Sequence, residues 1–288
     1  MNNAVDVLVL GGGPGGYTAA LYAARAGLSV LVLERLSAGG QMATTGTVEN
    51  YPGFEDGVDG FELGEKMQRQ AQRFGARTVL AEVREVALTE SPKRVETDRG
   101  TFLGRTVVVA TGAEARELGV PGEAALRGRG VSYCATCDAH FYKGKAVAVL
   151  GYNAESCREA DFLAETCARV LYFPVVPHEV NVGPNVTVVR ERVLSIPGTM
   201  RAEGVQTDKD LHPVDGVFVL RDAVAPDKLV PGLATDGPHV AVDAQMRTNL
   251  PGCFACGDLA GKPYQYIKAA GQGNIAALSA VEWLAEQK

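Results

Sequence analysis

The chain contains two cysteines separated by two residues, Cys134 and Cys137, and an acidic residue, Asp138, follows them directly. Cysteines at this spacing form a disulfide that exchanges readily, and a nearby helix N-terminus lowers the pKa of a thiol so that its thiolate attacks other disulfides. A carboxyl group beside such a pair can deliver or remove the proton that is needed when a thiolate leaves. The motif therefore predicts disulfide exchange, and the alternative is a pair of buried cysteines that only pack.

A second pair of cysteines, Cys253 and Cys256, has the same spacing. Zinc ribbons place two such pairs about 15–20 residues apart, and the two pairs of this chain lie much further from each other. We therefore expect no metal site, and we expect this second pair to pack in the core, as do Cys157 and Cys167. The four histidines have neither metal-ligand nor catalytic-triad spacing: His140, His178, His212 and His239.

A glycine-rich segment near the start of the chain fits a dinucleotide site. The sequence predicts a buried strand over 5–10, a helix over 17–26 and a second strand over 28–33 that ends at Glu34. The turn between the first strand and the helix satisfies the GxGxxG pattern, and the residues expected to contact a dinucleotide are Gly11, Gly13, Pro14, Gly15 and Gly16.

Each part of this segment has a physical role in dinucleotide binding. The glycines permit a tight turn and let the backbone approach a pyrophosphate closely. The start of the helix offers unpaired N–H groups and the positive end of the helix dipole to the phosphates. Glu34 can accept hydrogen bonds from ribose hydroxyls. The alternative is a glycine turn that serves only the packing of the helix on the strand.

The remaining sequence alternates between helical and strand-like stretches. Apolar runs predict strands over 78–88, 93–97 and 106–110. Helices are expected over 61–74 and 272–287.

Composition narrows the class of protein. The chain has 288 residues, of which 46% are hydrophobic, and its formal net charge is −6. This length suits two domains or one large one. The negative charge and the lack of a run rich in Lys and Arg argue against nucleic-acid binding. The sequence shows no basic leader and no apolar run of membrane-spanning length, so we expect a cytoplasmic protein without a membrane partner.

Together these motifs resemble those of the low-molecular-weight thioredoxin reductases. The most specific parts are the CATCD stretch that contains the dithiol and the GRGVS stretch that precedes it. The matching segments extend over nearly the whole chain: residues 11–16, 40–41, 48–53, 110–112, 128–132, 134–138 and 252–259.

The resemblance implies an α/β fold of two Rossmann-like three-layer domains of the nucleotide-binding type, the second inserted in the first. An FAD-binding domain would comprise residues 1–113 and 241–288. An inserted pyridine-nucleotide-type domain, residues 114–240, would carry the redox cysteines. The resemblance also implies a homodimer, and a rotation between the two domains that lets the dithiol alternate between the flavin and the partner protein.

Roles for individual residues also follow from the resemblance. The glycines of 11–16 would hold the pyrophosphate of FAD, and Glu34 would hold its ribose. Cys137 would face the flavin, Cys134 would attack the disulfide of the substrate, and Asp138 would act as the acid. Further residues implied at the ribityl chain, the adenine or the flavin ring are Gly40, Gln41, Asn50, Val83, Ala110, Thr111, Gly112, Gly257, Asp258, Gln265, Tyr266 and Ile267.

A second strand–turn–helix unit departs from the dinucleotide pattern. After a strand expected over 145–150 the turn begins with Gly151, but Asn153 replaces the second glycine and Ser156 the third. A side chain at residue 153 would obstruct the close approach of a pyrophosphate. Glu155 adds negative charge at the start of the helix that follows.

The segments that would recognise NADPH also depart from the pattern of the resembled family. A strand expected over 169–173 runs into 174–177, where the resembled family has a basic cluster for the 2′-phosphate, and this stretch has no Arg or Lys. Residues 221–223 replace a glycine-containing segment near the nicotinamide. We therefore expect an inserted domain with a degenerate NAD(P)H site, and the alternative is a divergent site that still binds the nucleotide.

These observations favour a flavin-dependent disulfide reductase that passes electrons from FAD through Cys134 and Cys137 to thioredoxin or a thioredoxin-like protein. Ferredoxin is the expected donor, because the chain resembles the ferredoxin-dependent flavin thioredoxin reductases in lacking the nucleotide motifs. Three alternatives stay open. They are an NADPH-dependent thioredoxin reductase with an atypical site, a disulfide oxidoreductase linked to a second flavin, and a non-catalytic flavin redox sensor.

Overall fold

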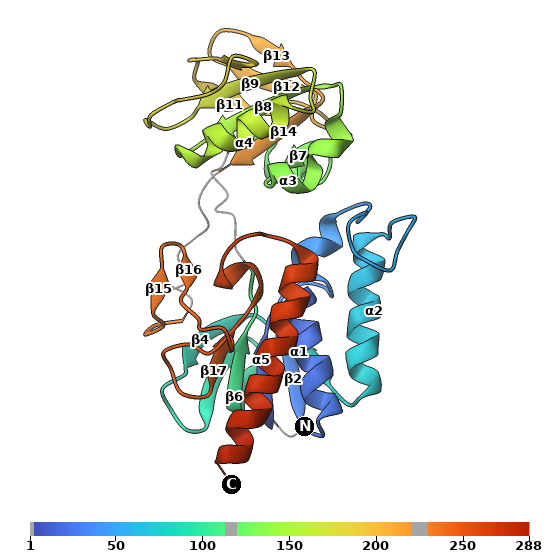
Figure 1. Cartoon of the computed structure of the whole chain (residues 1–288), viewed down its shortest axis with the longest axis vertical. Helices are drawn as coiled ribbons and strands as arrows, with labels where there is room; N and C mark the ends of the chain where they lie inside the picture. Colours follow the sequence, from blue (N-terminus) through green and yellow to red (C-terminus); the bar gives the residue numbers. More distant parts are fainter. Residues whose placement is uncertain (1–2, 113–119, 221–229, 288) are drawn as a thin grey trace. The chain divides into compact units, whose positions relative to one another are not determined.

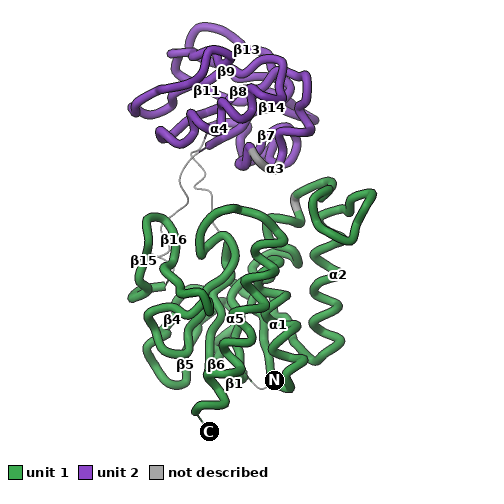
Figure 2. Tube along the Cα trace, viewed as in Figure 1, with its two compact units in different colours: residues 1–114, 224–288 green, residues 115–223 purple. Residues whose placement is uncertain are grey.

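The computed structural model describes residues 3–112, 120–220 and 230–287, without the side chains of Thr44, Thr136 and Cys137. The chain divides into two compact units, which Figure 2 shows in different colours. Unit 1 comprises residues 1–114 and 224–288, and unit 2 comprises residues 115–223. Each unit contains a largely parallel sheet with helices packed on it, so the expected α/β fold with two Rossmann-like units is confirmed.

The sheet of unit 1 has the strand order β3–β2–β1–β6–β5–β4. The first half of β6 pairs antiparallel with β5, and its second half pairs in parallel with β17. The strands are β1 (Ala4–Leu10), β2 (Val30–Glu34), β3 (Arg77–Leu80), β4 (Val83–Ala87), β5 (Lys93–Thr97), β6 (Gly100–Val109) and β17 (Cys253–Ala255).

Both faces of this sheet are covered, which explains why β1 is apolar from Val7 to Leu10. Val7 and Val9 pack in one core with Ala20 and the helices, while Leu8 and Leu10 pack in a second core on the opposite face. Helices α1 and α5 pack against each other, and α2 packs beside α1 (Figure 1). The helices and 3-10 segments are α1 (Pro14–Arg25), α2 (Gly60–Arg73), α5 (Tyr266–Glu286), η1 (Gly40–Thr44) and η5 (Gly257–Ala260).

Unit 2 has a parallel sheet in the order β10–β9–β8–β14–β7 and a small antiparallel sheet in the order β11–β12–β13. Helix α3 packs against α4: Ala135 of α3, together with Ala139 directly after it, shares a core with Cys157 and Ala160. Its elements are β7 (Val131–Ser132), α3 (Ala135–Asp138), β8 (Ala146–Gly151), α4 (Glu155–Ala164), β9 (Arg169–Pro174), β10 (Val186–Val188), β11 (Val193–Ser195), β12 (Gly204–Thr207), β13 (Leu211–Pro213) and β14 (Gly216–Leu220).

The observed organisation differs from the expected one in three places. The strand expected over 78–88 is two strands, because β3 runs parallel to β2 whereas β4 turns back to pair antiparallel with β5. Helix α5 begins at Tyr266, earlier than the expected start at residue 272. The second boundary between the two compact units also falls at 223/224 rather than at residue 240.

Residues after this boundary pack on unit 1. Val230, Leu233 and Val240 belong to the second core of that unit, and the short strands β15 (Thr235–Asp236) and β16 (His239–Val240) form a hairpin there. Among the described residues, no helix is both long and apolar enough to cross a membrane.

Helix α2 supports the loop that carries Gly40 and Gln41. The backbone of Gly60 approaches the carbonyl oxygen of Met42 so closely that a side chain at Gly60 would collide with it. The Oδ1 atom of Asp59 caps the helix by accepting a hydrogen bond from the N–H of Glu62 at 3.0 Å.

We expect Asp59→Ala to lower the free energy of unfolding by about 1 kcal/mol, because the helix loses its N-cap acceptor. Asp59→Asn keeps a side-chain oxygen and should change that free energy much less. Urea unfolding of both variants checks this prediction. Equal losses in the two variants would contradict a capping role for Asp59.

Candidate functional site

The glycine turn between β1 and α1 leaves the start of the helix open. Gly11 has a φ of +102°, and a side chain there would collide with the backbone of Ala110. A side chain at Gly16 would collide with the carbonyl oxygen of Gly11. By contrast, a Cβ at the N-cap residue Gly13 would have only the carbonyl oxygen of Gly39 nearby, at 3.9 Å. The start of α1 at Gly13 therefore has room for a group such as a pyrophosphate, which helix N-termini favour.

Glu34 ends β2 beside this turn and is held by backbone groups. Its side chain is buried and accepts hydrogen bonds from the N–H groups of Gly12 at 2.7 Å and Leu36 at 2.9 Å. The chain just before Val83 is anchored at the same place, since the N–H of Ala81 donates to the carbonyl oxygen of Glu34 at 2.8 Å. Glu34 and Val83 thus lie in one region, at the carboxyl end of β2 and the start of β4.

Three segments that the resemblance places near FAD meet at the carboxyl end of the central strands. They are the glycine turn, residues 40–41 and residues 110–112. Residues 110–112 follow β6 and contact the glycine turn through Ala110 and Gly11. A Cβ on Gly112, which has a φ of +75°, would lie 3.7 Å from Nε2 of Gln41. A Cβ on Gly40 would lie 3.4 Å from the Cα of Gly13. The register of the sheet therefore brings together residues that are far apart in the sequence.

Two side-chain hydrogen bonds join the loop after η1 to the start of α5. Nδ2 of Asn50 donates to Oε1 of Gln265 at 3.2 Å. The hydroxyl groups of Thr45 and Tyr266 lie 2.8 Å apart. These two bonds bring Asn50 and Thr45 to the start of α5, beside Gln265 and Tyr266, and Thr45 is an addition to the predicted set. Ile267 is 45% exposed.

The turn formed by η5 is fixed by two side chains of α5 that sequence reasoning missed. The N–H of Gly257 donates to Oε1 of Gln272 at 3.0 Å. Nζ of Lys268 donates to the carbonyl oxygen of Gly257 at 2.8 Å and also to that of Gly261. Burial raises the pKa of Asp258 to about 6, and the positive charge of Lys268 opposes this rise. Polar residues four apart in an otherwise small and apolar helix were the signal for this pair.

The redox motif of unit 2 lies at the start of α3. Cys134 is disulfide-bonded, and its N–H donates to Oγ of Ser132 at 3.2 Å. Burial raises the pKa of Asp138, while a hydrogen bond from Ser132 and the charge of His140 act in the opposite direction. A carboxyl group with a raised pKa holds a proton closer to neutral pH, as an acid catalyst requires. Ser132 was not among the predicted site residues.

The other four cysteines are free and buried, which fits packing: Cys157, Cys167, Cys253 and Cys256. Burial raises the pKa of Cys253 to about 11 and that of Cys256 to about 12. Both therefore stay protonated at neutral pH, where a thiol is a poor nucleophile. Cys256 also packs beneath the glycine turn, since a Cβ on Gly15 would lie 3.2 Å from its Sγ atom.

The second strand–turn–helix unit, from β8 to α4, is filled by its own side chains. Oδ1 of Asn153 accepts a hydrogen bond from the N–H of Ser156 at 2.9 Å. Oγ of Ser156 donates to the carbonyl oxygen of Asn153 at 2.5 Å and lies 2.6 Å from the hydroxyl of Tyr172. A Cβ on Gly151 would collide with the same hydroxyl. An N–H in the first turn of α4 is thus already bonded to the side chain of Asn153.

The segment after β9 continues this network. The hydroxyl of Tyr172 lies 2.6 Å from Nε2 of His178, whose Nδ1 lies 2.7 Å from the carbonyl oxygen of Val176. Val176, in the stretch 174–177 that contains no Arg or Lys, is exposed. Residues 221–223, the third expected departure, lie outside the described residues.

Comparisons with known proteins identify the family. Residues 5–273 match the pyridine nucleotide-disulphide oxidoreductase family. Thioredoxin reductase from Listeria monocytogenes is 35% identical, over 98% of this chain and 95% of that protein. The crystal structure of thioredoxin reductase from Streptococcus pyogenes is similar with a TM-score of 0.89 and 32% identity, over 99% of this chain and 100% of that one.

A ferredoxin-flavin thioredoxin reductase from Clostridium acetobutylicum is also similar, at 37% identity and a TM-score of 0.58, over 98% of this chain and 99% of that one. The chain belongs to the pyridine nucleotide-disulphide oxidoreductase family, among its low-molecular-weight thioredoxin reductases. It is therefore an oxidoreductase that acts on a thioredoxin disulfide.

The raised pKa of Asp258 predicts a pH-dependent stability. The pKa of this carboxyl group is about 6 in the folded apoprotein and about 3.9 when it is unfolded. Between these values the folded state binds more protons, so this group makes the free energy of unfolding fall as the pH rises from about 4 to about 6.

Asp258→Asn removes this contribution, and the apoprotein of the variant should gain stability over the wild type as the pH rises through that window. Urea unfolding of the apoproteins at several pH values measures the difference. Asp236→Asn, at an exposed aspartate of the same unit, serves as the control. A difference between Asp258→Asn and wild type that is constant from pH 4 to pH 7 would rule out this titration.

Proposed function

We propose that this reductase binds FAD in unit 1 and transfers electrons to a disulfide between Cys134 and Cys137, and from there to thioredoxin or a thioredoxin-like protein. The open start of α1, the carboxylate of Glu34 and the segments at the carboxyl end of the sheet fit a dinucleotide of this kind. FAD held there would supply the two electrons that reduce the disulfide. The residues of the chain then supply the thiol chemistry.

The reduced dithiol would act in two exchange steps. The thiolate of Cys134 attacks the disulfide of thioredoxin, forms a mixed disulfide and releases one thioredoxin thiolate, which takes a proton from Asp138. The thiol of Cys137 then gives its proton to the Asp138 carboxylate, and the resulting thiolate attacks the sulfur of Cys134. This attack releases the second thioredoxin thiolate, which takes that proton from Asp138, and restores the disulfide. Two electrons and two protons have then moved to thioredoxin. The raised pKa of Asp138 supports its role as the acid.

We further propose that ferredoxin, rather than NADPH, supplies the electrons, one at a time. The observation that carries this proposal is the hydrogen bond from the N–H of Ser156 to the side chain of Asn153. A pyrophosphate would need that N–H and the space that Asn153 and Tyr172 fill. The similar structure named as a ferredoxin-flavin thioredoxin reductase supports the same donor.

An NADPH-dependent reductase is the second candidate. Unit 2 keeps the five-stranded parallel sheet of a nucleotide-binding unit and the first glycine of its turn, Gly151. These features would accommodate NADPH only if Asn153 and Tyr172 moved away from the start of α4.

Assembly as a homodimer stays a proposal. The outer face of α5 supports it, because three large apolar side chains are exposed there: Ile267, Ile275 and Leu278, with exposed fractions of 45%, 38% and 51%.

Anaerobic spectra of the FAD-loaded protein test the donor. We expect reduced ferredoxin to bleach the flavin absorption band promptly, and NADPH or NADH at sub-millimolar concentration to leave it unchanged. An NADPH-dependent thioredoxin reductase treated in parallel serves as the control for the nucleotides. Bleaching by NADPH would establish the second candidate, and no response to any donor would favour a diflavin enzyme or a redox sensor.

Trapping of a mixed disulfide tests the order of the cysteines. The probe is a thioredoxin in which one active-site cysteine is activated as a disulfide with an aromatic thiol and the other is replaced by serine. Reduced Cys137→Ser protein should form a stable mixed disulfide with this probe. The resolving thiol is absent from this variant, so the intermediate persists. Non-reducing electrophoresis detects it, and Cys134→Ser is the matched control. Faster trapping by Cys134→Ser than by Cys137→Ser would reverse the two assignments.

A further inference from the structure

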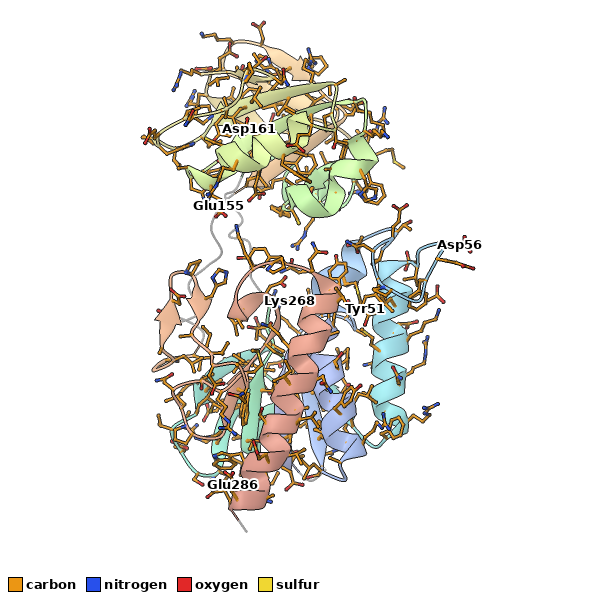
Figure 3. All side chains as sticks on the ribbon, viewed as in Figure 1. Tyr51, Asp56, Glu155, Asp161, Lys268 and Glu286 are labelled. Atoms are coloured by element: carbon orange, nitrogen blue, oxygen red, sulfur yellow. The ribbon has the colours of Figure 1, made fainter. Side chains whose placement is uncertain are left out.

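The ammonium group of Lys268, a residue of α5, contacts backbone carbonyl oxygens of the turn that precedes this helix. Lys268 lies in the first turn of α5, as Figure 3 shows, and is only partly exposed. Its Nζ atom donates to the carbonyl oxygens of Gly257 and Gly261, the two ends of the turn that contains Asp258. One side chain thus spans this turn.

A neutral side chain already holds the same turn. Gln272 lies one helical turn beyond Lys268 and accepts a hydrogen bond from the N–H of Gly257. Unlike the amide of Gln272, the side chain of Lys268 carries a positive charge. Partial burial of this charge costs free energy, because the ammonium group loses hydration. Burial lowers the pKa of Lys268, while the charge of Asp258 opposes this change. The carboxylate of Asp258 therefore stabilises the charge of Lys268, and Lys268 stabilises the carboxylate in return.

We propose that Lys268 is a positioning residue of the FAD site, which holds the Gly257–Gly261 turn and presents the carboxylate of Asp258 to a hydroxyl group of the cofactor. This inference rests on the proposed FAD site. The carboxylate oxygens are acceptors only, and a hydroxyl donor binds an ionised carboxylate more strongly than a neutral carboxyl group. Without Lys268, the buried carboxyl group of Asp258 loses the cation that favours its ionised form.

The affinity of the apoprotein for FAD tests this role. It is measured from the quenching of flavin fluorescence when FAD binds. Lys268→Met should raise the dissociation constant at least about tenfold, the factor typical of a lost hydrogen bond to a charged group. Lys268→Arg keeps a cation with several donors and should restore most of the affinity. Lys262→Met removes an exposed lysine next to the same turn and should leave the affinity unchanged.

A double-substitution cycle separates positioning from a general structural role. Because Lys268 acts through Asp258, Lys268→Met should weaken FAD binding little further in a protein that already carries Asp258→Asn. Thermal unfolding of each apoprotein shows whether the variants are folded. If Lys268→Met does not fold, Lys268→Gln is used in its place.

Two results would overturn the inference. One is a dissociation constant for Lys268→Met within twofold of the wild-type value, and the other is full additivity of the two substitutions. A wild-type apoprotein that binds no FAD would instead overturn the proposed function, so the two failures are distinguishable.

Discussion

The first N–H groups of a helix have no partner within the helix, and each must find an acceptor elsewhere. The two units of this protein meet this constraint in opposite ways. At α1 the turn is made of glycines, and the space before the N-cap residue Gly13 stays open. At α4 the side chain of Asn153 accepts the N–H of Ser156, and Tyr172 fills the space behind. One topology therefore leaves an open turn in unit 1, where we propose that FAD binds, and a closed turn in unit 2.

The register of the sheet in unit 1 explains how distant segments form one site. Strand β6 pairs in parallel with both β1 and β17, so Leu10, Val109 and Ala255 end at the same edge. The glycine turn, residues 110–112 and the turn at Asp258 follow these three strands directly. Because parallel strands present their carboxyl ends at one edge, a ligand there contacts all three segments. A slip in the register of β17 would move Asp258 away from the other two.

The features that depend on local pattern could be predicted from the sequence. The glycine turn has its expected form, and β5 occupies its expected range of 93–97. Features that depend on long-range contacts could not be predicted. The spacing of Lys268 and Gln272 marks them as a pair, but nothing near Lys268 in the sequence shows that its ammonium group meets the carbonyl oxygens of Gly257 and Gly261. Val230 and Leu233 likewise join unit 1 only through cores built by distant strands.

The packing of α3 explains why a nucleotide-type fold without an open nucleotide turn is still needed. Ala135, between the two redox cysteines, and Ala139, directly after Asp138, are buried against Cys157 and Ala160 of α4. Helix α4 in turn packs on β8 and β9, so the position of the dithiol depends on the whole layer of sheet and helix. Asn153 and Ser156 close the turn at the start of α4, and Tyr172 of β9, which bonds to Ser156, also belongs to the core that α3 and α4 share. The closed turn between β8 and α4 is therefore part of the packed layer that positions the dithiol.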